Sequence, residues 1–339
     1  MSHNNYELLA EVFRGTNRNG QLEGPRIESS HYGIVAIVDE DANPLFSRGN
    51  VHLKTYIRSA AKPFQILPLF ESEAVPHFGF TPKECAVICG SHNGEPIHVE
   101  NVRSILTKIG LEESHLQCGV HPPSLDSAAA QMHYNHERFT ALHNNCSGKH
   151  AGMLACCVYN GWPIETYLEP DHPLQSRIAH YVREFSGANE EIFRGTDGCS
   201  APVFYLEMIQ MARMFAQLGA QKHPLLKKSF AVMRAEPYMI GGGKRFDTDL
   251  MLNSAVAGKV GGEGIHCVAV PATNTGKAMG IAVKIADGNF RALYPVVISL
   301  LKKLGALNEN QIQSLSYYAH TPLRNHRKKE IGFIQSCIG

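Results

Sequence analysis

The fold is decided by two β-branched runs that lie near opposite ends of the chain. The first is Gly33-Ile34-Val35-Ala36-Ile37-Val38, after which the apolar run Pro44-Leu45-Phe46 returns. The second is Ile265-His266-Cys267-Val268-Ala269-Val270, which is followed by a similar run from 279 to 285 and by Asp287-Gly288. Such runs, separated by polar turn residues, are typical of hairpins. We therefore expect an antiparallel strand pair near each end.

The middle of the chain has the pattern of helices. Thr81-Pro82-Lys83-Glu84 predicts a capping box, in which the threonine hydroxyl accepts from the third helical amide, the glutamate reaches back, and proline loses nothing at the first position. This helix should end at Gly90 and leave 91–95 as an exposed loop. Further helices are predicted over 99–109, 149–159, 173–185, 203–218, 225–235 and 293–304.

These elements predict an α/β protein whose antiparallel sheet is built from both chain ends, with a helical insertion between them. Strands and helices do not alternate, so a purely parallel winding is not expected. No linker-like stretch marks a domain boundary. We expect a single catalytic unit over 1–339, with an α/β part of about 1–80 and 241–339 and a helical part of about 81–240.

Composition excludes several classes of function. The 339 residues are 44% hydrophobic and carry a formal net charge of +1, so nothing favours binding to nucleic acid or to an anionic membrane. No run reaches the roughly 18–20 apolar residues of a spanning helix, and the N-terminus lacks a signal-peptide pattern. We expect a cytoplasmic protein with reduced cysteines, of which Cys85, Cys89, Cys156 and Cys157 have the setting of small core hydrophobes.

The first candidate for chemistry is Arg58-Ser59-Ala60-Ala61-Lys62-Pro63. Residues three apart share a helix face, so Ser59 Oγ and Lys62 Nζ should come within hydrogen-bond reach. A serine hydroxyl becomes a nucleophile when a base takes its proton, and a lysine is that base only when its surroundings keep it neutral. By itself the Ser-x-x-Lys tetrad also fits a solvated helix surface.

The second candidate is the glycine-rich segment 258–264, which contains Lys259 and precedes the strand at 265. A Lys-x-Gly sequence that enters a strand, together with a Ser-x-x-Lys helix, is the arrangement of serine β-lactamases and penicillin-binding enzymes. Its cation would disfavour protonation of Lys62 and could anchor a substrate carboxylate. A glycine-rich turn with a surface lysine is the alternative.

The loop Gly90-Ser91-His92-Asn93-Gly94-Glu95 holds a third set of polar groups. Ser91 stands where penicillin-recognising enzymes have a second catalytic hydroxyl. His92 fits a general base or a hydrogen-bonded structural histidine equally well. Arg245, in the segment 241–248, fits either a bidentate clamp for a substrate carboxylate or an exposed loop charge.

Two glycine-marked turns carry the last candidates, Cys146 with Lys149 in Asn144-Asn145-Cys146-Ser147-Gly148-Lys149-His150, and Cys199 in Thr196-Asp197-Gly198-Cys199-Ser200. Thiolates at helix starts suit zinc binding or nucleophilic attack. The spacing matches no standard zinc finger, and Lys149 would have to lose its proton to act as a ligand. From spacing alone, zinc is the minority interpretation.

Taken together and in order, these motifs resemble the rhizobial-type L-asparaginases, an asparaginase II-like family related in fold to serine β-lactamases and glutaminases. The resemblance covers most of the chain. The tail 324–329, Arg-Asn-His-Arg-Lys-Lys, departs from the glycine-richer tail expected, which bears on C-terminal packing and dimer contacts.

The resemblance implies hydrolysis of L-asparagine to L-aspartate and ammonia by a homodimer. It implies two catalytic pairs, Ser59 with Lys62 and Ser91 with Lys259, and a zinc ion held by Cys146, Lys149 and Cys199. Further residues are assigned to substrate binding (Arg58, His92, Asn93, Glu95 and Arg245) or to support of the metal site (Asp197 and His150). Which serine attacks is left open, because either has a lysine.

Three rival interpretations remain from the sequence. A β-lactamase or transpeptidase would share the serine and lysine motifs but would require export. A non-catalytic zinc-dependent amino-acid-binding protein would need Cys146, Lys149 and Cys199 but neither serine. A glutaminase or other amidohydrolase is the third. Glutamine differs from asparagine by one methylene, which is worth only about 1–3 kcal/mol of discrimination between the two substrates.

Overall fold

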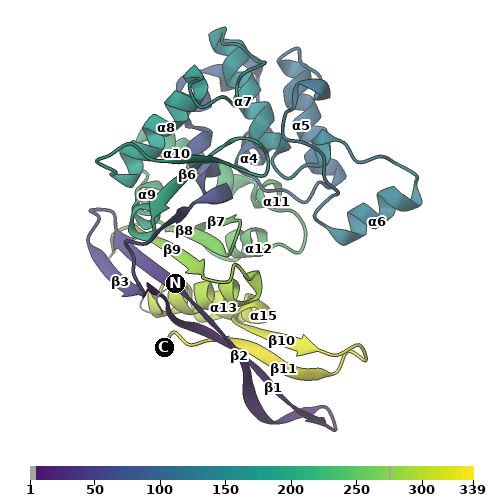
Figure 1. Cartoon of the computed structure of the whole chain (residues 1–339), viewed down its shortest axis with the longest axis vertical. Coiled ribbons are helices and arrows are strands. Elements are labelled where there is room, and N and C mark those ends of the chain that lie inside the picture. The colour runs from purple at the N-terminus through teal and green to yellow at the C-terminus, as the bar shows by residue number, and fades with distance from the viewer. Residues whose placement is uncertain (1–4, 275) are drawn as a thin grey trace. The chain divides into compact units, whose positions relative to one another are not determined.

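The computed structural model describes residues 5–274 and 276–339, and these form two compact units (Figure 1). The sheet unit comprises the described residues up to Thr55 together with Glu207–Gly219 and Leu252–Gly339. The helical unit comprises Tyr56–Leu206 and Ala220–Met251. Among the described residues, no helix has the length and apolar character needed to cross a membrane.

One antiparallel sheet organises the sheet unit. Its strands run in the order β10-β11-β1-β2-β9-β8-β7, and β3 pairs with β2 off this path. The strands are β1 (Glu7–Arg18), β2 (Gln21–Asp39), β3 (Pro44–Arg48), β7 (Ala257–Gly261), β8 (Ile265–Val270), β9 (Met279–Ile285), β10 (His320–Arg324) and β11 (Glu330–Ser336). The short strand β4 (Lys54–Tyr56) lies at the unit boundary.

Both predicted strand pairs are confirmed. β2 pairs with β3 through Ile37 and Phe46, and β8 pairs with β9 through Val268 and Ile281. The two ends of the chain meet where β2 pairs with β9, with Val35 opposite Val283. The predicted fold class, an antiparallel sheet built from both chain ends with a helical insertion between them, is therefore confirmed.

Several strands were not predicted. β1, β10 and β11 lie beyond the two runs on which the prediction rested, and β2 begins twelve residues before Gly33. The glycine-rich segment that contains Lys259 is itself strand β7 rather than a turn before a strand. The helix predicted over 203–218 is wrong in its first third, because β6 (Pro202–Glu207) precedes helix α9 (Met208–Ala220).

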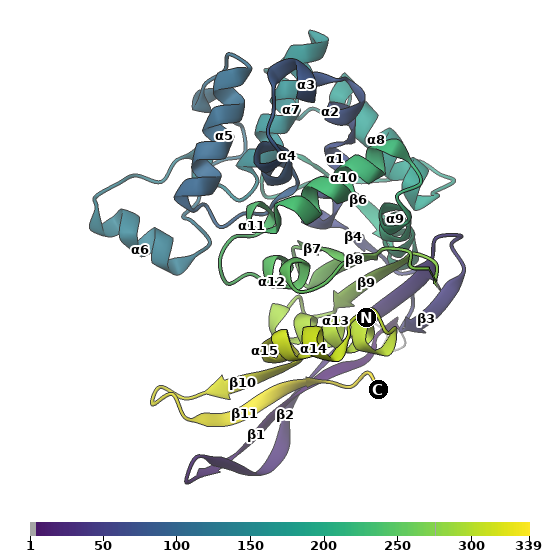
Figure 2. The same cartoon turned by 180° about the vertical axis from the view of Figure 1, so that it is seen from behind.

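Helices cover both faces of this sheet. α9 packs directly on β9 at Gly280, where an added Cβ would overlap the backbone of Ala212. α13 (Phe290–Lys303) lies on the other face (Figure 1), and Figure 2 shows α14 (Glu309–Ser314) and α15 (Ser316–Ala319) beside it. Apolar strands buried between two helical layers give the unit its core.

The helical unit is built from short and medium helices. They are η2 (Arg58–Ala61), α1 (Lys62–Gln65), α2 (Leu67–Glu71), α3 (Ala74–Phe78), α4 (Pro82–Cys89), α5 (Pro96–Lys108), η3 (Glu113–His115), α6 (Asp126–Tyr134), η4 (Ala141–His143), α7 (Ser147–Asn160), α8 (Pro173–Ser186), α10 (Pro224–Ala235), α11 (Pro237–Ile240) and α12 (Phe246–Leu252). A small strand, β5 (Arg194–Thr196), pairs with β6.

The centre of the helical unit is the contact between α4 and α7. The predicted capping box is confirmed at the start of α4, where Thr81 accepts from the amide of Glu84 and the carboxylate of Glu84 accepts from the amide of Thr81. An added Cβ at Gly148 would overlap the carbonyl of Val87, and one at Gly152 would lie 2.6 Å from the side chain of Ile88. Gly148 therefore lets the helices approach backbone to backbone, and Gly152 makes room for the side chain of Ile88.

The unit boundaries differ from the predicted division at 80/81 and 240/241. Residues 56–80 fold into short helices, two of which begin around Pro63 and Pro68 and pack on α4, α8 and α10. Residues 207–219 leave the helical part because α9 covers the sheet. Proline fixes where a helix starts. Which unit the helix packs into depends on its apolar face. No linker in the sequence marks the boundary between the two units.

Candidate active site

A buried lysine lies at the start of α1, just after η2. Lys62 is 1% exposed, and its Nζ hydrogen-bonds to the carbonyl oxygen of Gly90, to Ser91 Oγ at 3.0 Å and to the carbonyl oxygen of Asn145 at 3.2 Å. An ammonium group would donate to all three oxygens, whereas a neutral amine would donate to the two carbonyl oxygens and accept from Ser91. In either case Lys62 Nζ and Ser91 Oγ form a hydrogen-bonded pair.

The predicted hydrogen bond between Ser59 and Lys62 is not formed. Ser59 is half-buried, and its Oγ makes no hydrogen bond to any described residue. The prediction assumed regular α-helix, whereas residues 58–61 form a 3-10 turn and the α-helix starts only at Lys62. The carbonyls of Gly90 and Asn145 supply the acceptors that a buried amine needs.

Lys259 belongs to the sheet unit, whereas Ser91 belongs to the helical unit. Lys259 lies in β7 opposite Cys267, is fully buried, and its Nζ donates to the carbonyl oxygen of Val260 at 2.8 Å. The pairing of Ser91 with Lys259 stays a prediction.

His92 is buried with both ring nitrogens in use. Nδ1 accepts from the amide of Gly94 at 3.1 Å, and Nε2 lies 3.0 Å from the hydroxyl of Ser147, which itself donates to the carbonyl oxygen of Leu142. Burial holds the pKa of His92 well below its ordinary value. This neutral imidazole links the loop after α4 to the start of α7, and both of its nitrogens are occupied by contacts within the chain.

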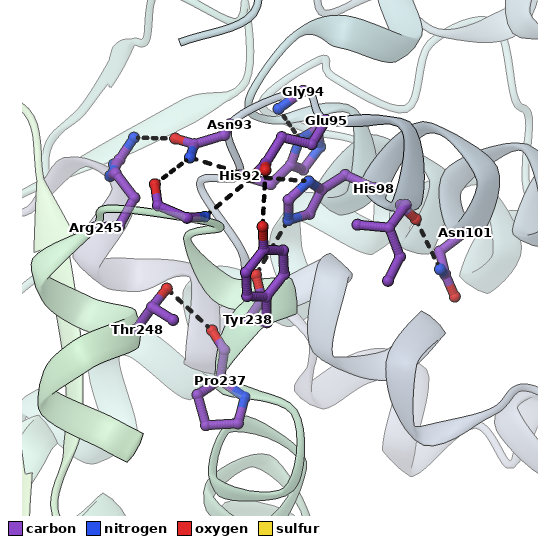
Figure 3. Close-up of polar contacts among 12 residues, drawn as sticks. His92, Asn93, Gly94, Glu95, His98, Asn101, Pro237, Tyr238, Arg245 and Thr248 are labelled. Carbon is purple, nitrogen blue, oxygen red and sulfur yellow. Dashed lines mark hydrogen bonds and ion pairs between the residues drawn. The ribbon is translucent and has the colours of Figure 1, made fainter. Parts of the chain in front are cut away.

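Asn93 and Glu95 are also occupied by contacts within the chain (Figure 3). Asn93 Nδ2 donates to the carbonyl oxygen of Gly243 at 2.8 Å, and its Oδ1 accepts from Arg245 at 3.1 Å. Glu95 accepts from the hydroxyl of Tyr238 at 2.7 Å and from the amide of Gly243 at 3.1 Å. Burial alone would raise the pKa of Glu95, but these hydrogen bonds outweigh it and hold the pKa below its ordinary value.

Arg245 differs from its neighbours because most of its hydrogen-bonding capacity is unused. Within the described residues its side chain makes one hydrogen bond, to Asn93. A guanidinium has five N–H donors, so four remain for a ligand. Of the five residues predicted to bind substrate, Arg245 and Arg58 each keep four donors unused among the described residues, since Arg58 makes a single side-chain hydrogen bond, to Asp197.

Arg58, also predicted to bind substrate, is paired with Asp197. Its Nε donates to Asp197 Oδ1 at 2.6 Å, and both side chains are largely buried. Burial would raise the pKa of Asp197, but the charges of Lys149 and Arg58 outweigh it and lower that pKa. Arg58 and Ser200 have positive φ angles of 52° and 68°, so each turn holds a non-glycine residue in a sparsely populated conformation. Such strain tends to cluster at functional sites.

The predicted metal ligands Cys146, Lys149 and Cys199 lie together in the helical unit, and all three are at least 96% buried. Lys149 Nζ donates to Cys199 Sγ at 2.9 Å. A hydrogen bond from Cys199 lowers the pKa of Cys146 well below its ordinary value, and the charges of Lys62 and Lys149 add to that effect. The pKa of Cys199 is raised, first by the same hydrogen bond and then by burial. The Lys149 amine therefore lies beside two sulfurs whose pKa values are shifted in opposite directions.

This donor set fits zinc. Two sulfurs and an amine nitrogen are soft and borderline donors of the kinds that Zn²⁺ accepts. Zinc would have to displace the protons of Cys199 and Lys149, and the pKa of Lys149 is raised because the two neighbouring sulfurs outweigh its burial. In the part of the chain that the structure describes, no three His, Cys, Asp or Glu side chains group as a metal site. A zinc site here therefore depends on the lysine.

His150 was predicted to support the metal site. It is fully buried, its Nδ1 lies 2.7 Å from the hydroxyl of Tyr167, and its Nε2 has no partner among the described residues.

Sequence reasoning missed Ser147 and Tyr238, and it missed the carbonyls of Gly90 and Asn145. Backbone acceptors carry no residue-specific signal in a sequence, so only the folded chain reveals them.

A serine hydroxyl held against a buried lysine is the arrangement of hydrolases in which an amine activates serine. The chain belongs to the family described as L-asparaginase II, which its sequence matches over residues 21–336. This confirms the resemblance to an asparaginase II-like family.

Solved structures with some similarity include two kinds of protein. "Mglu in its glutamate form" is 14% identical with a TM-score of 0.43, and the match covers 81% of this chain and 61% of that one. A "probable glutaminase from Bacillus subtilis complexed with 6-diazo-5-oxo-L-norleucine" is 11% identical with a TM-score of 0.39, covering 81% of this chain and 84% of that one. This chain thus spans about three fifths of the length of Mglu. No curated protein sequence matches the chain.

Proposed function

We propose that this protein hydrolyses the side-chain amide of L-asparagine to L-aspartate and ammonia by acyl transfer through a serine. The observation that carries the proposal is Lys62, a buried amine whose Nζ hydrogen-bonds to two carbonyl oxygens and to the hydroxyl of Ser91 and also interacts with Cys146. This environment suits a base that takes a hydroxyl proton and later returns it. Membership of the L-asparaginase II family supports the choice of amide substrate.

Ser59 is our candidate for the attacking serine. Its Oγ is unbonded and half-buried, whereas Ser91 is 6% exposed and already in contact with Lys62. Catalytic hydrogen bonds are often incomplete before substrate binds, so the proposal requires Ser59 Oγ to approach Lys62 Nζ when substrate is bound. In this scheme Ser59 Oγ attacks the amide carbon and its proton passes to Lys62. That proton then goes to the departing ammonia, and water hydrolyses the aspartyl ester.

Ser91 and Lys259 are proposed to relay the second proton, as the resemblance implies. Backbone amides in the glycine-marked turns are suited to stabilise the oxyanion. Arg245 is proposed to bind the α-carboxylate of the substrate, because four of its donors are unused. A homodimer is likewise a prediction from the resemblance.

Zinc is proposed to be held by Cys146, Lys149 and Cys199. When bound, the ion would supply a Lewis-acid position that helps to orient a substrate oxygen. Asp197 would hold Cys199 and Arg58 in place, since its two oxygens contact both residues. The proposed acyl transfer itself needs only the serines and lysines.

The test is ammonia release from L-asparagine, L-glutamine and D-asparagine, each with and without chelator. We expect L-asparagine to be the best substrate and Ser59→Ala to lose activity by at least about 10³-fold while keeping its fold. A diazoketone analogue of asparagine should label the attacking serine, and peptide mass spectrometry identifies it. A label on Ser91 would reverse the assignment, and near-normal turnover by Ser59→Ala would eliminate Ser59 as the nucleophile.

A further inference from the structure

The segment from Tyr238 to Arg245 lies against the loop that follows α4, and two side chains fasten it there (Figure 3). Glu95 accepts hydrogen bonds from two points along this segment, from the hydroxyl of Tyr238 at 2.7 Å and from the amide of Gly243 at 3.1 Å. One carboxylate therefore joins a side chain before the glycine run to a backbone amide within it. Hydrogen bonds to a charged acceptor are the stronger kind.

The glycine run is shaped to fit this contact. Gly242 has a φ of 103°, and an added Cβ would overlap Glu95 and lie 2.7 Å from Asn93 Nδ2. Lys244, which follows, has a φ of 58°. A left-handed backbone at a non-glycine residue costs free energy, so the segment holds this shape only while its contacts last.

The ring of Tyr238 is also supported. It stacks on His98 with centroids 5.8 Å apart, and His98 stacks on His92 at 5.0 Å. His98 is fully buried and lies 3.1 Å, through Nε2, from the carbonyl oxygen of Tyr238. The ring is thus fixed independently of its hydroxyl, and the hydroxyl is aimed at Glu95.

We propose that Tyr238 and Glu95 form a latch that closes the 241–245 loop on Asn93 and so presents Arg245 to the substrate carboxylate. They are positioning residues that act through Arg245, so in this proposal Glu95 acts on the loop, and its predicted contact with substrate stays a prediction. Asn93 links the loop to Arg245, because its Nδ2 donates to the carbonyl oxygen of Gly243 and its Oδ1 accepts from Arg245. The role of Arg245 rests on the proposed function, whereas the latch itself rests only on these contacts.

Limited proteolysis tests the latch without reference to activity. Lys244 is exposed and is followed by Arg245, so trypsin cuts there when the loop opens. Tyr238→Phe removes the hydroxyl and keeps the ring. We expect cleavage after residues 244 and 245 to become about tenfold faster, the change given by a hydrogen bond to a charged group. Glu95→Gln should act in the same direction.

Tyr159→Phe is the matched control. Tyr159 is 38% exposed against 39% for Tyr238, its ring packs edge-on against His77 at 5.1 Å, and its hydroxyl bonds no described residue. Its cleavage rate at 244 and 245 should equal that of the parent protein. Equal rates for Tyr238→Phe and Tyr159→Phe, with folding verified by circular dichroism, would overturn the latch.

Kinetics test what the latch serves. Tyr238→Phe should raise KM for L-asparagine about tenfold and change kcat less than about twofold, as expected when ground-state binding alone is lost. In an Arg245→Gln background the same substitution should add nothing to KM. An equal rise in both backgrounds would overturn the link to Arg245. If the parent protein releases no ammonia from any amide, the proposed function fails and the proteolysis result still decides the latch.

Discussion

Two buried lysines of the helical unit show how partners, not burial, decide what an amine can do. Lys62 and Lys149 each lie in the first turn of a helix and are 1% and 3% exposed. Lys62 meets two carbonyl oxygens and a hydroxyl, whereas Lys149 meets a thiol. The first setting can accept and return a proton, and the second can exchange a proton for a metal ion. The same residue type therefore defines a catalytic candidate in one place and a binding candidate in the other.

The largest expected effect is at Lys62. Lys62→Met keeps the length of the side chain but removes the base, so kcat for ammonia release should fall by about 10³-fold. Lys83→Met, an exposed change in the first turn of α4, is the control and should retain full activity. If Lys62→Met keeps an activity within tenfold of the parent protein, Lys62 is not the catalytic base.

The next effect concerns the sulfur partner of Lys149. Cys199→Ser replaces a soft donor by a hydroxyl, so zinc bound after equilibration and gel filtration should fall by about tenfold or more, measured by mass spectrometry of the metal. Cys337→Ser changes a half-buried free cysteine outside the cluster and should leave zinc content unchanged. Equal zinc content in Cys199→Ser and Cys337→Ser would show that Cys199 is not a zinc ligand. The metal-binding role inferred for the Lys149 site would then be wrong.

The smallest effect sharpens the comparison through Asp197, whose pKa is lowered by Lys149 and Arg58 against the effect of burial. A carboxyl group with a lowered pKa in the folded state stabilises the fold above about pH 4, and that contribution is lost as pH falls through the folded pKa. Asp197→Asn should therefore lower the free energy of unfolding by about 1–2 kcal/mol at pH 7. Urea titrations should show this difference shrinking below about pH 4, and a difference independent of pH would contradict the charge contribution.

The parts of the fold that depend on local chemistry were predictable. Thr81 and Glu84 specified their helix because a capping box involves only neighbouring residues. The apolar strands β8 and β9 were predicted because each is short, buried and bounded by turn residues. Periodicity failed at 203–218, where β6 runs into α9 with no glycine or proline between them, so the apolar run gives no sign of the change.

The site was predictable as a set of residues but not as a set of contacts. The motif search selected Ser59, Lys62 and Ser91, and local spacing paired Lys62 with Ser59, whereas the hydroxyl that Lys62 contacts in the structure is that of Ser91. The actual partners of Lys62 lie 28, 29 and 83 residues further along the chain, and two of them are backbone carbonyls. His92 shows the same limit, since its partner Ser147 is 55 residues away.

The glycine contact between α4 and α7 has a consequence for anyone who alters this protein. α4 ends at the loop that contains Ser91, and α7 begins beside Cys146 and carries Lys149 in its first turn. Because Gly148 faces the backbone of Val87, a single methyl group at this position would push the two helices apart and displace both Ser91 and Lys149. Mutant libraries that seek a new amide specificity should therefore keep the contact between α4 and α7 unchanged and vary the residues around Arg245.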